Sequence, residues 1–448
     1  MNVRFYNAKL LLLSSHDTMG INETEETAAE KEEIFIGEVW VEGNRITFAG
    51  THAEALQKSR EESDIRWDRE MDCEGNLLMP GFKNAHTHSP MTFLRSFADD
   101  MPLQEWLNQQ VFPMEAKLTD RDMYELTRLA ILEYLTSGVT ACFDMYLLTE
   151  PRVRAALDCG FRMVICGSVN DFTGSPEQME QDYIRYRNNQ DSLISCQLGF
   201  HAEYTTGRDL LEQIAKMADR YQAPVYMHLS ETRQEVEACR KRYSMSPVEF
   251  LDSCGMFRYG GGGFHCVHVS EQDMEILKER GVFVISNPAS NMKLASGIAP
   301  IEEMERRGIP IAIGTDGAAS NNCLDMFREM YLLTGLQKLS TGNASALPAD
   351  KVLKMAALNG ARAMGLIDCD GIAVGNKADL ILIDLHRPNM QPQNHLVKNL
   401  VYSGSKENIK LTMVDGKILY EEHQFYIEAD PEEIYRKANE IITRIIRA

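Results

Sequence analysis

The sequence predicts an α/β fold, a (β/α)8 TIM barrel with a small β-sandwich domain built from both chain ends. Two observations carry this prediction. Eight short apolar stretches alternate with amphipathic helical stretches through the middle of the chain, and β-rich patterns occupy both ends. Strand–helix alternation indicates a parallel sheet, and eight such units indicate a closed barrel.

The barrel is expected over residues 79–372. Its strands are predicted at residues 81–88, 139–145, 162–169, 194–201, 224–228, 263–269, 281–287 and 309–315. Between them, stretches such as 121–135, 209–221 and 271–280 show helical apolar spacing with charged faces. Because such barrels carry their chemistry at the carboxyl ends of the strands, the residues that close each strand are the candidate functional residues.

Residues 1–78 and 373–424 are expected to form the small β domain together, because neither part alone supplies enough strands for a core. Turn residues predict hairpins around 39–48 and 411–420, and residues 378–384 form a predicted strand. The acidic stretch 22–33 lacks an apolar period and is predicted to be a solvated loop. Residues 425–448 are predicted to contain a helix capped by Asp430 and packed on the body through one apolar stripe.

The composition excludes several classes of function. The chain has 448 residues and a net charge of −20, which argues against nucleic acid as a partner because a phosphate-binding face needs clustered Lys and Arg. The apolar run at residues 10–13 is too short to span a membrane or to act as a signal segment. The ten cysteines form no C-x-x-C pair, which indicates unpaired thiols in a reducing cytoplasm.

His86 and His88 close the first predicted barrel strand, soon after the turn residues Pro80 and Gly81. Side chains two residues apart on a strand share a face, and two imidazoles on one face can bind one metal ion. Alone, the pair could also be two surface or core histidines. The other strand ends therefore decide the interpretation.

Five of the eight predicted strands end in, or carry near their end, a histidine or aspartate. Beyond the first strand, these residues and the nearby acid are His201, His228, Glu231, His265, His268 and Asp316. A single such histidine is often a core residue, but a set of them around one barrel rim favours a functional site.

The sequence resembles the metal-dependent amidohydrolase superfamily, and within it the methylthioadenosine/S-adenosylhomocysteine deaminases and their chlorohydrolase relatives. The motifs that carry the resemblance are PGFKNAHTHSPMT at 80–92, HLSET at 228–232, HCVH at 265–268, SNPASNMKLASGIAP at 286–300 and GTDGAASNN at 314–322. The resemblance covers nearly the whole chain, and it implies a hydrolase that acts on C–N bonds of cyclic amidines.

The resemblance implies that His86, His88, His228 and Asp316 ligate one divalent metal ion, with Zn²⁺ expected and Fe²⁺ or Mn²⁺ as alternatives. Such a set leaves a position for water, as a catalytic site requires. A bound metal lowers the pKa of water to roughly 7, which makes hydroxide available at neutral pH.

The resemblance also implies the catalytic proton-transfer groups. Glu231 would protonate the ring nitrogen beside the carbon under attack. Asp316, with His265, would take up the hydroxide proton, orient the nucleophile and help release ammonia. His268 competes for that last role. Three residues apart on a strand, His265 and His268 would face oppositely, and the family pattern favours His265 and leaves His268 structural.

Three further positions match family residues near the substrate. Glu115 would accept hydrogen bonds from ribose hydroxyls, although it could also be an exposed loop carboxylate. Trp106 would lie near the nucleoside or serve as a core aromatic. His201 would help to hold the far end of the substrate.

At the 5′ end of the substrate the chain departs from its relatives. Some relatives hold the carboxylate of a homocysteine-type substrate with arginines, which suit bidentate recognition. The corresponding positions here are Cys166 and Gln178, although Arg185 or Arg187 could substitute. We therefore expect methylthioadenosine, 5′-deoxyadenosine or adenosine to be preferred over S-adenosylhomocysteine.

The expected function is hydrolytic deamination of an adenine nucleoside to the inosine analogue and ammonia. Alternatives on the same site are a deaminase of guanine, another aminopurine or a pterin, and a triazine-type chlorohydrolase; Glu115 argues weakly against substrates without ribose. A non-catalytic binding barrel would lack metal ligands, and none is missing here. The resemblance also implies a homo-oligomer with a small-molecule substrate and neither a nucleic-acid nor a membrane partner.

Overall fold

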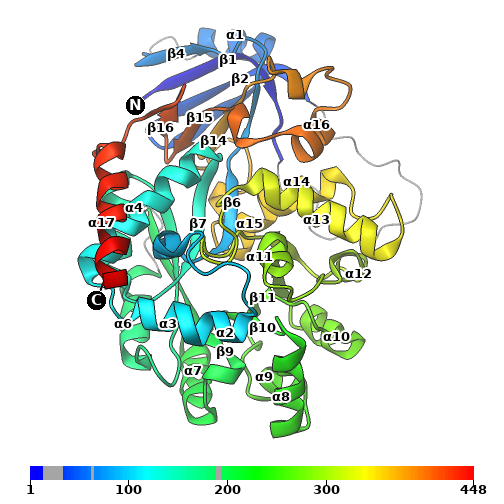
Figure 1. Cartoon of the computed structure of the whole chain (residues 1–448). Coiled ribbons are helices and arrows are strands. Elements are labelled where there is room, and N and C mark those ends of the chain that lie inside the picture. The colour runs from blue at the N-terminus through cyan, green and yellow to red at the C-terminus, as the bar shows by residue number, and fades with distance from the viewer. Residues whose placement is uncertain (14–33, 62–64, 188–192, 448) are drawn as a thin grey trace.

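The structure, a computed structural model, describes residues 1–13, 34–61, 65–187 and 193–447. A parallel eight-stranded sheet forms a barrel, and a mixed nine-stranded sheet lies at one end of it (Figure 1). The loop predicted at 22–33 lies outside the described residues. Within these residues, no helix is long and apolar enough to cross a membrane.

The barrel contains all eight predicted strands, each paired in parallel with the next along the chain. They are β6 (Phe82–Thr87), β7 (Val139–Met145), β8 (Arg162–Cys166), β9 (Ile194–Ala202), β10 (Val225–Leu229), β11 (Gly261–His265), β12 (Val282–Ser286) and β13 (Ile311–Ile313). Just after β13, the main-chain N–H of Asp316 donates to the carbonyl of His86 (2.9 Å) and brings the two ends of the sheet together. Gly314 permits this approach, because a Cβ there would lie 2.6 Å from the main-chain nitrogen of His86.

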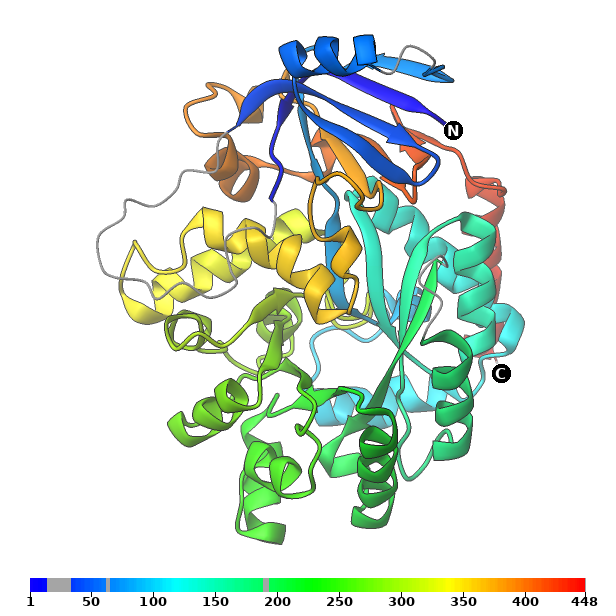
Figure 2. The same cartoon turned by 180° about the vertical axis from the view of Figure 1, so that it is seen from behind.

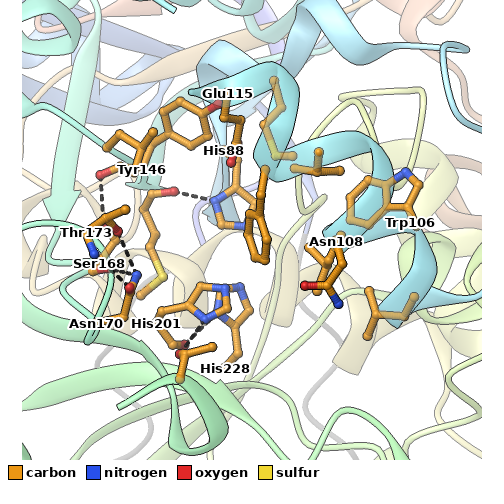
Figure 3. A pocket seen from close by; sticks show the side chains of 18 of the residues that line it. His88, Trp106, Asn108, Glu115, Tyr146, Ser168, Asn170, Thr173, His201 and His228 are labelled. Atoms are coloured by element: carbon orange, nitrogen blue, oxygen red, sulfur yellow. Dashed lines mark hydrogen bonds between the residues drawn. The ribbon is translucent and has the colours of Figure 1, made fainter. Parts of the chain in front are cut away.

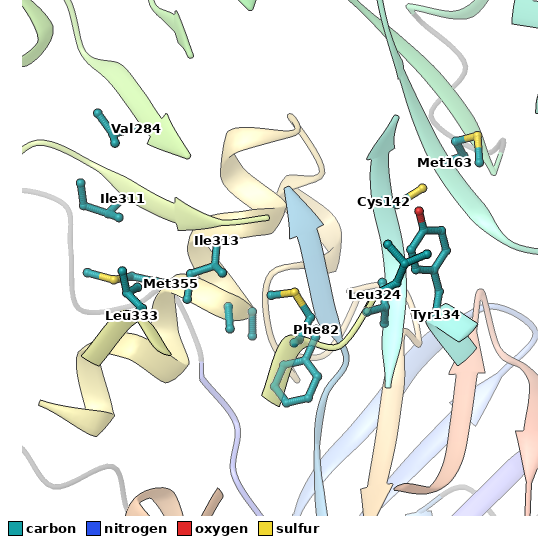
Figure 4. Packing of buried hydrophobic residues seen from close by; sticks show 14 of the residues in the cluster. Phe82, Tyr134, Cys142, Met163, Val284, Ile311, Ile313, Leu324, Leu333 and Met355 are labelled. Atoms are coloured by element: carbon teal, nitrogen blue, oxygen red, sulfur yellow. The ribbon is translucent and has the colours of Figure 1, made fainter. Parts of the chain in front are cut away.

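Helices follow most barrel strands and cover the outside of the sheet (Figures 1 and 2). They are α4 (Asp120–Thr136), α5 (Thr149–Cys159), α6 (Pro176–Tyr186), α7 (Arg208–Tyr221), α8 (Arg233–Tyr243), α9 (Pro247–Ser253), α10 (Glu271–Glu279), α11 (Pro288–Lys293), α12 (Ile301–Arg306), α13 (Met326–Thr341), α14 (Ala349–Ala356) and α15 (Leu358–Ala363). Capping boxes begin α4, α8 and α10, which explains why these helices start where they do. Apolar side chains from strands and helices interlock between the two layers (Figure 4).

The small β domain is built from both chain ends, as predicted. Its strands are β1 (Val3–Leu10), β2 (Phe35–Glu42), β3 (Arg45–Thr51), β4 (Arg69–Asp72), β5 (Leu77–Pro80), β14 (Leu380–Ile383), β15 (Ile409–Val414), β16 (Lys417–Glu421) and β17 (Gln424–Phe425). The two predicted hairpins are β2–β3 and β15–β16, and β5 lies between β1 and β14. Helices α1 (His52–Glu61) and α16 (Leu396–Ser403) flank this sheet (Figure 1).

The β domain meets the barrel at the start of the barrel strands. Arg162, the first residue of β8, is buried and forms two hydrogen bonds with the carboxylate of Asp379 (2.8 and 3.0 Å) and a third with Asp415 (2.8 Å). Because the sheet covers this end, the opposite end, where the strands finish, is available for a site.

The chain closes with α17 (Pro431–Arg447), which packs beside α4 (Figure 1). The carboxylate of Asp430 accepts from the N–H of Glu432 (3.1 Å) and caps the helix as predicted. The buried stripe is Ile434, Ala438, Ile441 and Ile445. This helix thus stabilises the body through an apolar contact.

Candidate active site

The predicted metal-binding residues come together at the carboxyl ends of the barrel strands. One nitrogen each of His86, His228 and His265 lie within 4.8 Å of one another, as do ligand atoms of His86, His88 and Asp316. His86 lies on β6, His228 on β10 and His265 at the end of β11, and all three are buried.

Hydrogen bonds determine which nitrogen of each imidazole faces the cluster. Nδ1 of His88 donates to a main-chain carbonyl, as does Nδ1 of His228 (2.7 Å), and Nδ1 of His265 donates to Oδ1 of Asn291 (2.7 Å). Because carbonyl oxygens only accept, Nδ1 of each ring carries a hydrogen, and in the neutral form that can bind a cation Nε2 keeps a lone pair. Metal-binding histidines in proteins are held in the same way.

His86 is the most enclosed of these residues. Its ring stacks on Phe264 with centroids 3.8 Å apart, and neither ring nitrogen has a hydrogen-bond partner among the described residues. Burial holds the pKa of His86 well below 6.5, so the ring is neutral. A buried polar group without a partner costs free energy, and a metal ion would satisfy it. Imidazole nitrogens with one carboxylate are a donor set that suits a catalytic divalent cation.

One carboxylate oxygen of Asp316 faces the histidines, and the other accepts hydrogen bonds from two serine hydroxyls. Oδ1 lies 3.2 Å from Nε2 of His88 and 3.6 Å from Nε2 of His86. Oδ2 accepts from the hydroxyls of Ser290 (2.6 Å) and Ser320 (2.8 Å). Burial alone would raise the pKa of Asp316, but the hydrogen bond and charge of His88 hold it well below its usual range. The carboxylate is therefore ionised and oriented.

Glu231 lies at the edge of the cluster on a turn that follows β10. The carboxylate of Glu235 accepts from the N–H groups of Ser230 and Glu231 (both 2.8 Å) and fixes this turn. The hydroxyl of Ser296 donates to Oε1 of Glu231 (3.2 Å), and Oε2 lies 4.0 Å from Nε2 of His265. Burial raises the pKa of Glu231, which favours a protonated acid.

We predicted a strand through residue 269 with His265 and His268 on opposite faces of it. This prediction was wrong, because a turn lies between the two residues. β11 ends at His265, and positive φ values at His265 (72°) and Cys266 (46°) turn the chain. His265 faces the cluster. Nε2 of His268 instead donates to the carbonyl of Ser296 (2.7 Å), the residue whose hydroxyl contacts Glu231.

A cavity of about 490 Å³ opens above the cluster. Its floor includes His88, His228, His265, Glu231 and Asp316. One wall is the helical segment of α2 (Leu103–Glu105), the π-helical turn η3 (Trp106–Val111) and α3 (Phe112–Glu115), and the facing wall is the connection between β8 and α6 (Figure 3). The cavity has room for a small molecule of nucleoside size.

Trp106 and Glu115 both line this cavity, at the two ends of the first wall. Trp106 is also packed in an apolar cluster, so it has both of the positions considered from the sequence. Burial raises the pKa of Glu115 to about 7, and the Tyr146 hydroxyl and the charge of His88 oppose the shift. Glu115 is therefore no ordinary exposed loop carboxylate.

His201 lines the cavity at the end of β9, with its ring 5.0 Å from that of His228. The Thr205 hydroxyl donates to the carbonyl of Ala202 (3.1 Å), so its oxygen accepts from Nδ1 of His201 (2.8 Å). Burial lowers the pKa of His201 to about 4. The ring thus offers a neutral Nε2 acceptor.

The four positions considered for a carboxylate clamp lie away from the cavity. Cys166 is buried in β8, and Gln178 is exposed on α6. Arg185 pairs with Glu150 (3.0 Å), and the guanidinium of Arg187 lies over two tyrosine rings, 5.4 and 4.5 Å from their centroids. None of the four lines the cavity.

From the sequence we assigned no role to the residues that position the proposed catalytic side chains through hydrogen bonds. Ser290, Asn291, Ser296 and Ser320 lie within the motifs at 286–300 and 314–322, which was the signal that could have found them. Their partners depend on how the loops after β12 and β13 fold, which residue type and spacing do not determine. The wall between β8 and α6 gave no sequence signal at all.

A parallel barrel whose strand ends gather histidines and an aspartate beneath an open cavity defines a class of protein, the metal-dependent hydrolases of TIM-barrel fold. Residues 77–419 match the amidohydrolase family. The chain belongs to this family, which confirms the resemblance and the predicted fold class.

Relatives of known name agree with this assignment. The chain is 38% identical to a 5-methylthioadenosine/S-adenosylhomocysteine deaminase from Pelotomaculum thermopropionicum, over 92% of this chain and 94% of the relative. A zinc-bound adenosine deaminase from Xanthomonas campestris superposes with a TM-score of 0.89 at 30% identity, covering 100% of this chain and 99% of that one. A zinc complex of atrazine chlorohydrolase from Arthrobacter aurescens superposes with a TM-score of 0.84 at 19% identity, covering 98% and 100%, which shows the fold alone.

Proposed function

We propose that this protein hydrolytically deaminates an adenine nucleoside to the corresponding inosine analogue and ammonia. The observation that carries the proposal is Glu231, a buried acid that lines the cavity beside the metal-binding cluster, with its Oε2 4.0 Å from Nε2 of His265. A relative that shares 38% identity over 92% of the chain and is named a 5-methylthioadenosine/S-adenosylhomocysteine deaminase supports it.

His86, His88, His228 and Asp316 would hold the metal, and zinc is the ion we propose. A divalent cation at this position supplies water activation, because it lowers the pKa of water to about 7. His88 and His228 each have Nδ1 occupied by a carbonyl, so each offers Nε2. The two serines donate to Oδ2 of Asp316, and Oδ1, which also accepts from the N–H of Gly317 (2.7 Å), faces the histidines where the cation would lie.

Proton transfer would be divided between the two sides of the cluster. A new bond forms between the water oxygen and the amino-bearing carbon of the ring, while Glu231 gives its proton to the neighbouring ring nitrogen. Asp316 and His265 take one proton of the water and pass it to the amino group, which leaves as ammonia when its C–N bond breaks. The second water proton returns to the Glu231 carboxylate as the ring carbonyl forms, so the acid is restored. His265 suits this role because Nδ1–H is held by Asn291 and Nε2 keeps its lone pair.

The substrate would lie along the cavity between its two walls. Glu115 would accept hydrogen bonds from ribose hydroxyls, and Trp106 and His201 would contact the nucleoside on opposite sides (Figure 3). Aromatic and imidazole rings suit a flat heterocycle and its sugar. The homo-oligomeric state and the cytoplasmic location stay predictions.

A panel of substrates tests the proposal. Protein loaded with zinc is incubated with adenosine, 5′-deoxyadenosine, methylthioadenosine, guanine, a pterin and a chlorotriazine, and ammonia or chloride release is followed. We expect ammonia from the adenine nucleosides alone. Release only from free bases or the triazine would replace the proposal with another hydrolase, and no turnover by metal-loaded protein would favour a binding protein.

A further inference from the structure

The wall between β8 and α6 is a short, firmly held segment. The side-chain carbonyl of Asn170 accepts from the N–H groups of Phe172 (2.9 Å) and Thr173 (3.0 Å). The Ser168 hydroxyl donates to the carbonyl of Tyr146 (2.8 Å). Four side chains of the segment line the cavity, and they are Ser168, Asn170, Phe172 and Thr173.

The same segment is anchored to the rim of the barrel by Asp171. Its N–H donates to the carbonyl of Thr205 (3.0 Å), and its carboxylate accepts from the N–H of Gly207 (2.8 Å), the residue before α7. The wall therefore carries a negative charge next to the residues that face the cavity. Phe172 remains 81% exposed at the mouth and presents an apolar ring there.

No cation of the described chain lines this cavity. Among its lining residues three are carboxylic acids, Glu115, Glu231 and Asp316, and none is Lys or Arg. Arg152, on the helix after β7, is buried and bonded to Asp144 (2.9 Å) and to main-chain carbonyls. With Arg185 and Arg187 engaged elsewhere, a carboxylate on the substrate would find no positive partner here.

We infer that this cavity selects nucleosides whose 5′ substituent is uncharged and largely apolar, such as an alkylthio group, and discriminates against the amino-acid tail of S-adenosylhomocysteine. This inference rests on the proposed deamination of adenine nucleosides. The tail carries an ammonium and a carboxylate, and no Lys or Arg among the residues that line the cavity is available to pair with the carboxylate. Desolvating a carboxylate without a partner costs far more than desolvating an alkylthio group, for which Phe172 supplies apolar contact.

Substrate comparison tests the inference with the unmodified protein. The ratio kcat/KM is measured for methylthioadenosine, for 5′-butylthioadenosine, which has the length of the homocysteine tail without its charges, and for S-adenosylhomocysteine. We expect both alkylthio substrates to exceed S-adenosylhomocysteine at least about tenfold, a difference of about 1.4 kcal/mol. Equal or better turnover of S-adenosylhomocysteine would overturn the inference and leave the deaminase proposal intact, whereas turnover of no adenine nucleoside would overturn both.

A gain of charge at the wall provides the second test. Phe172→Arg places a cation at the mouth without removing any hydrogen bond of the segment. Because a solvent-exposed ion pair is worth roughly 0.2–1 kcal/mol, kcat/KM for S-adenosylhomocysteine relative to butylthioadenosine should rise up to about fivefold. Leu339→Arg, at a 76% exposed position on α13, is the matched control and should leave this ratio unchanged. An unchanged ratio in Phe172→Arg, or an equal rise in the control, would count against the inference.

Discussion

The floor and the outer wall of the cavity are built differently. The floor consists of side chains at strand ends, buried and held from behind, as Asp316 is held by two serines and His265 by Asn291. The wall between β8 and α6 consists of partly or largely exposed side chains on a connection, held by hydrogen bonds of the Asn170 and Asp171 side chains. We therefore expect the reaction and the choice of substrate to reside in separable parts of the molecule, so that each part can be perturbed alone.

The largest loss of activity is expected when the metal ion is removed from the floor of the cavity. Chelation, or His228→Ala, is expected to abolish ammonia release from every substrate, because no remaining group lowers the pKa of water sufficiently. Metal analysis and activity after adding Zn²⁺, Fe²⁺ or Mn²⁺ check this, and chelated wild type should recover while the variant does not. Full activity in the metal-free protein would show that the histidine and aspartate cluster does not bind a metal ion that the reaction needs.

The second-largest loss of activity is expected for the variant Glu231→Gln. The variant loses the proton donor but keeps the shape of the side chain, so kcat should fall about 10²- to 10⁴-fold with the metal still bound. Glu237→Gln, on the exposed face of α8, is the control and should behave as wild type. Loss of metal in Glu231→Gln would mean that Glu231 is a ligand and not the acid.

Ser296→Ala should have a smaller effect. It removes the 3.2 Å hydrogen bond to Oε1 of Glu231, and one such bond is worth about 0.5–1.5 kcal/mol, so kcat should fall about two- to tenfold. Metal content and KM should not change if Ser296 positions Glu231. The exposed Ser345→Ala serves as control, and an effect confined to KM would assign Ser296 to substrate binding.

The smallest expected effect is a pH dependence of substrate binding set by Glu115, which lies on the helical wall formed by α2, η3 and α3. Burial raises the pKa of Glu115 to about 7, against the opposing Tyr146 hydroxyl and charge of His88. The carboxylate form, which accepts hydrogen bonds from ribose, therefore dominates above this pH, and a bound cation would shift the midpoint lower. KM for adenosine should fall a few-fold as the pH rises through the midpoint, and Glu115→Gln should abolish this change. A pH dependence retained in Glu115→Gln would assign the titration to the floor.

The floor of the cavity could largely be predicted from the sequence, whereas the wall between β8 and α6 could not. The ligands could be found because each stands at a strand end in a repeating pattern, and strand ends of a parallel barrel must meet. The turn at His265 and Cys266 could not, since positive φ at non-glycine residues leaves no mark in residue type. The wall could not either, because loop conformation depends on contacts such as Asp171 with Gly207 that join distant segments.

The pairing of β5 with β14 has a consequence for how the protein is made. These strands share one sheet although 77–80 and 380–383 lie at opposite ends of the chain. During synthesis the apolar strand Leu77–Pro80 therefore keeps one edge unpaired until the whole barrel has been translated. Unpaired apolar edges promote aggregation, and such distant pairing is slow to form. We therefore expect a nascent chain halted before residue 380 to aggregate more readily than a chain that includes β14.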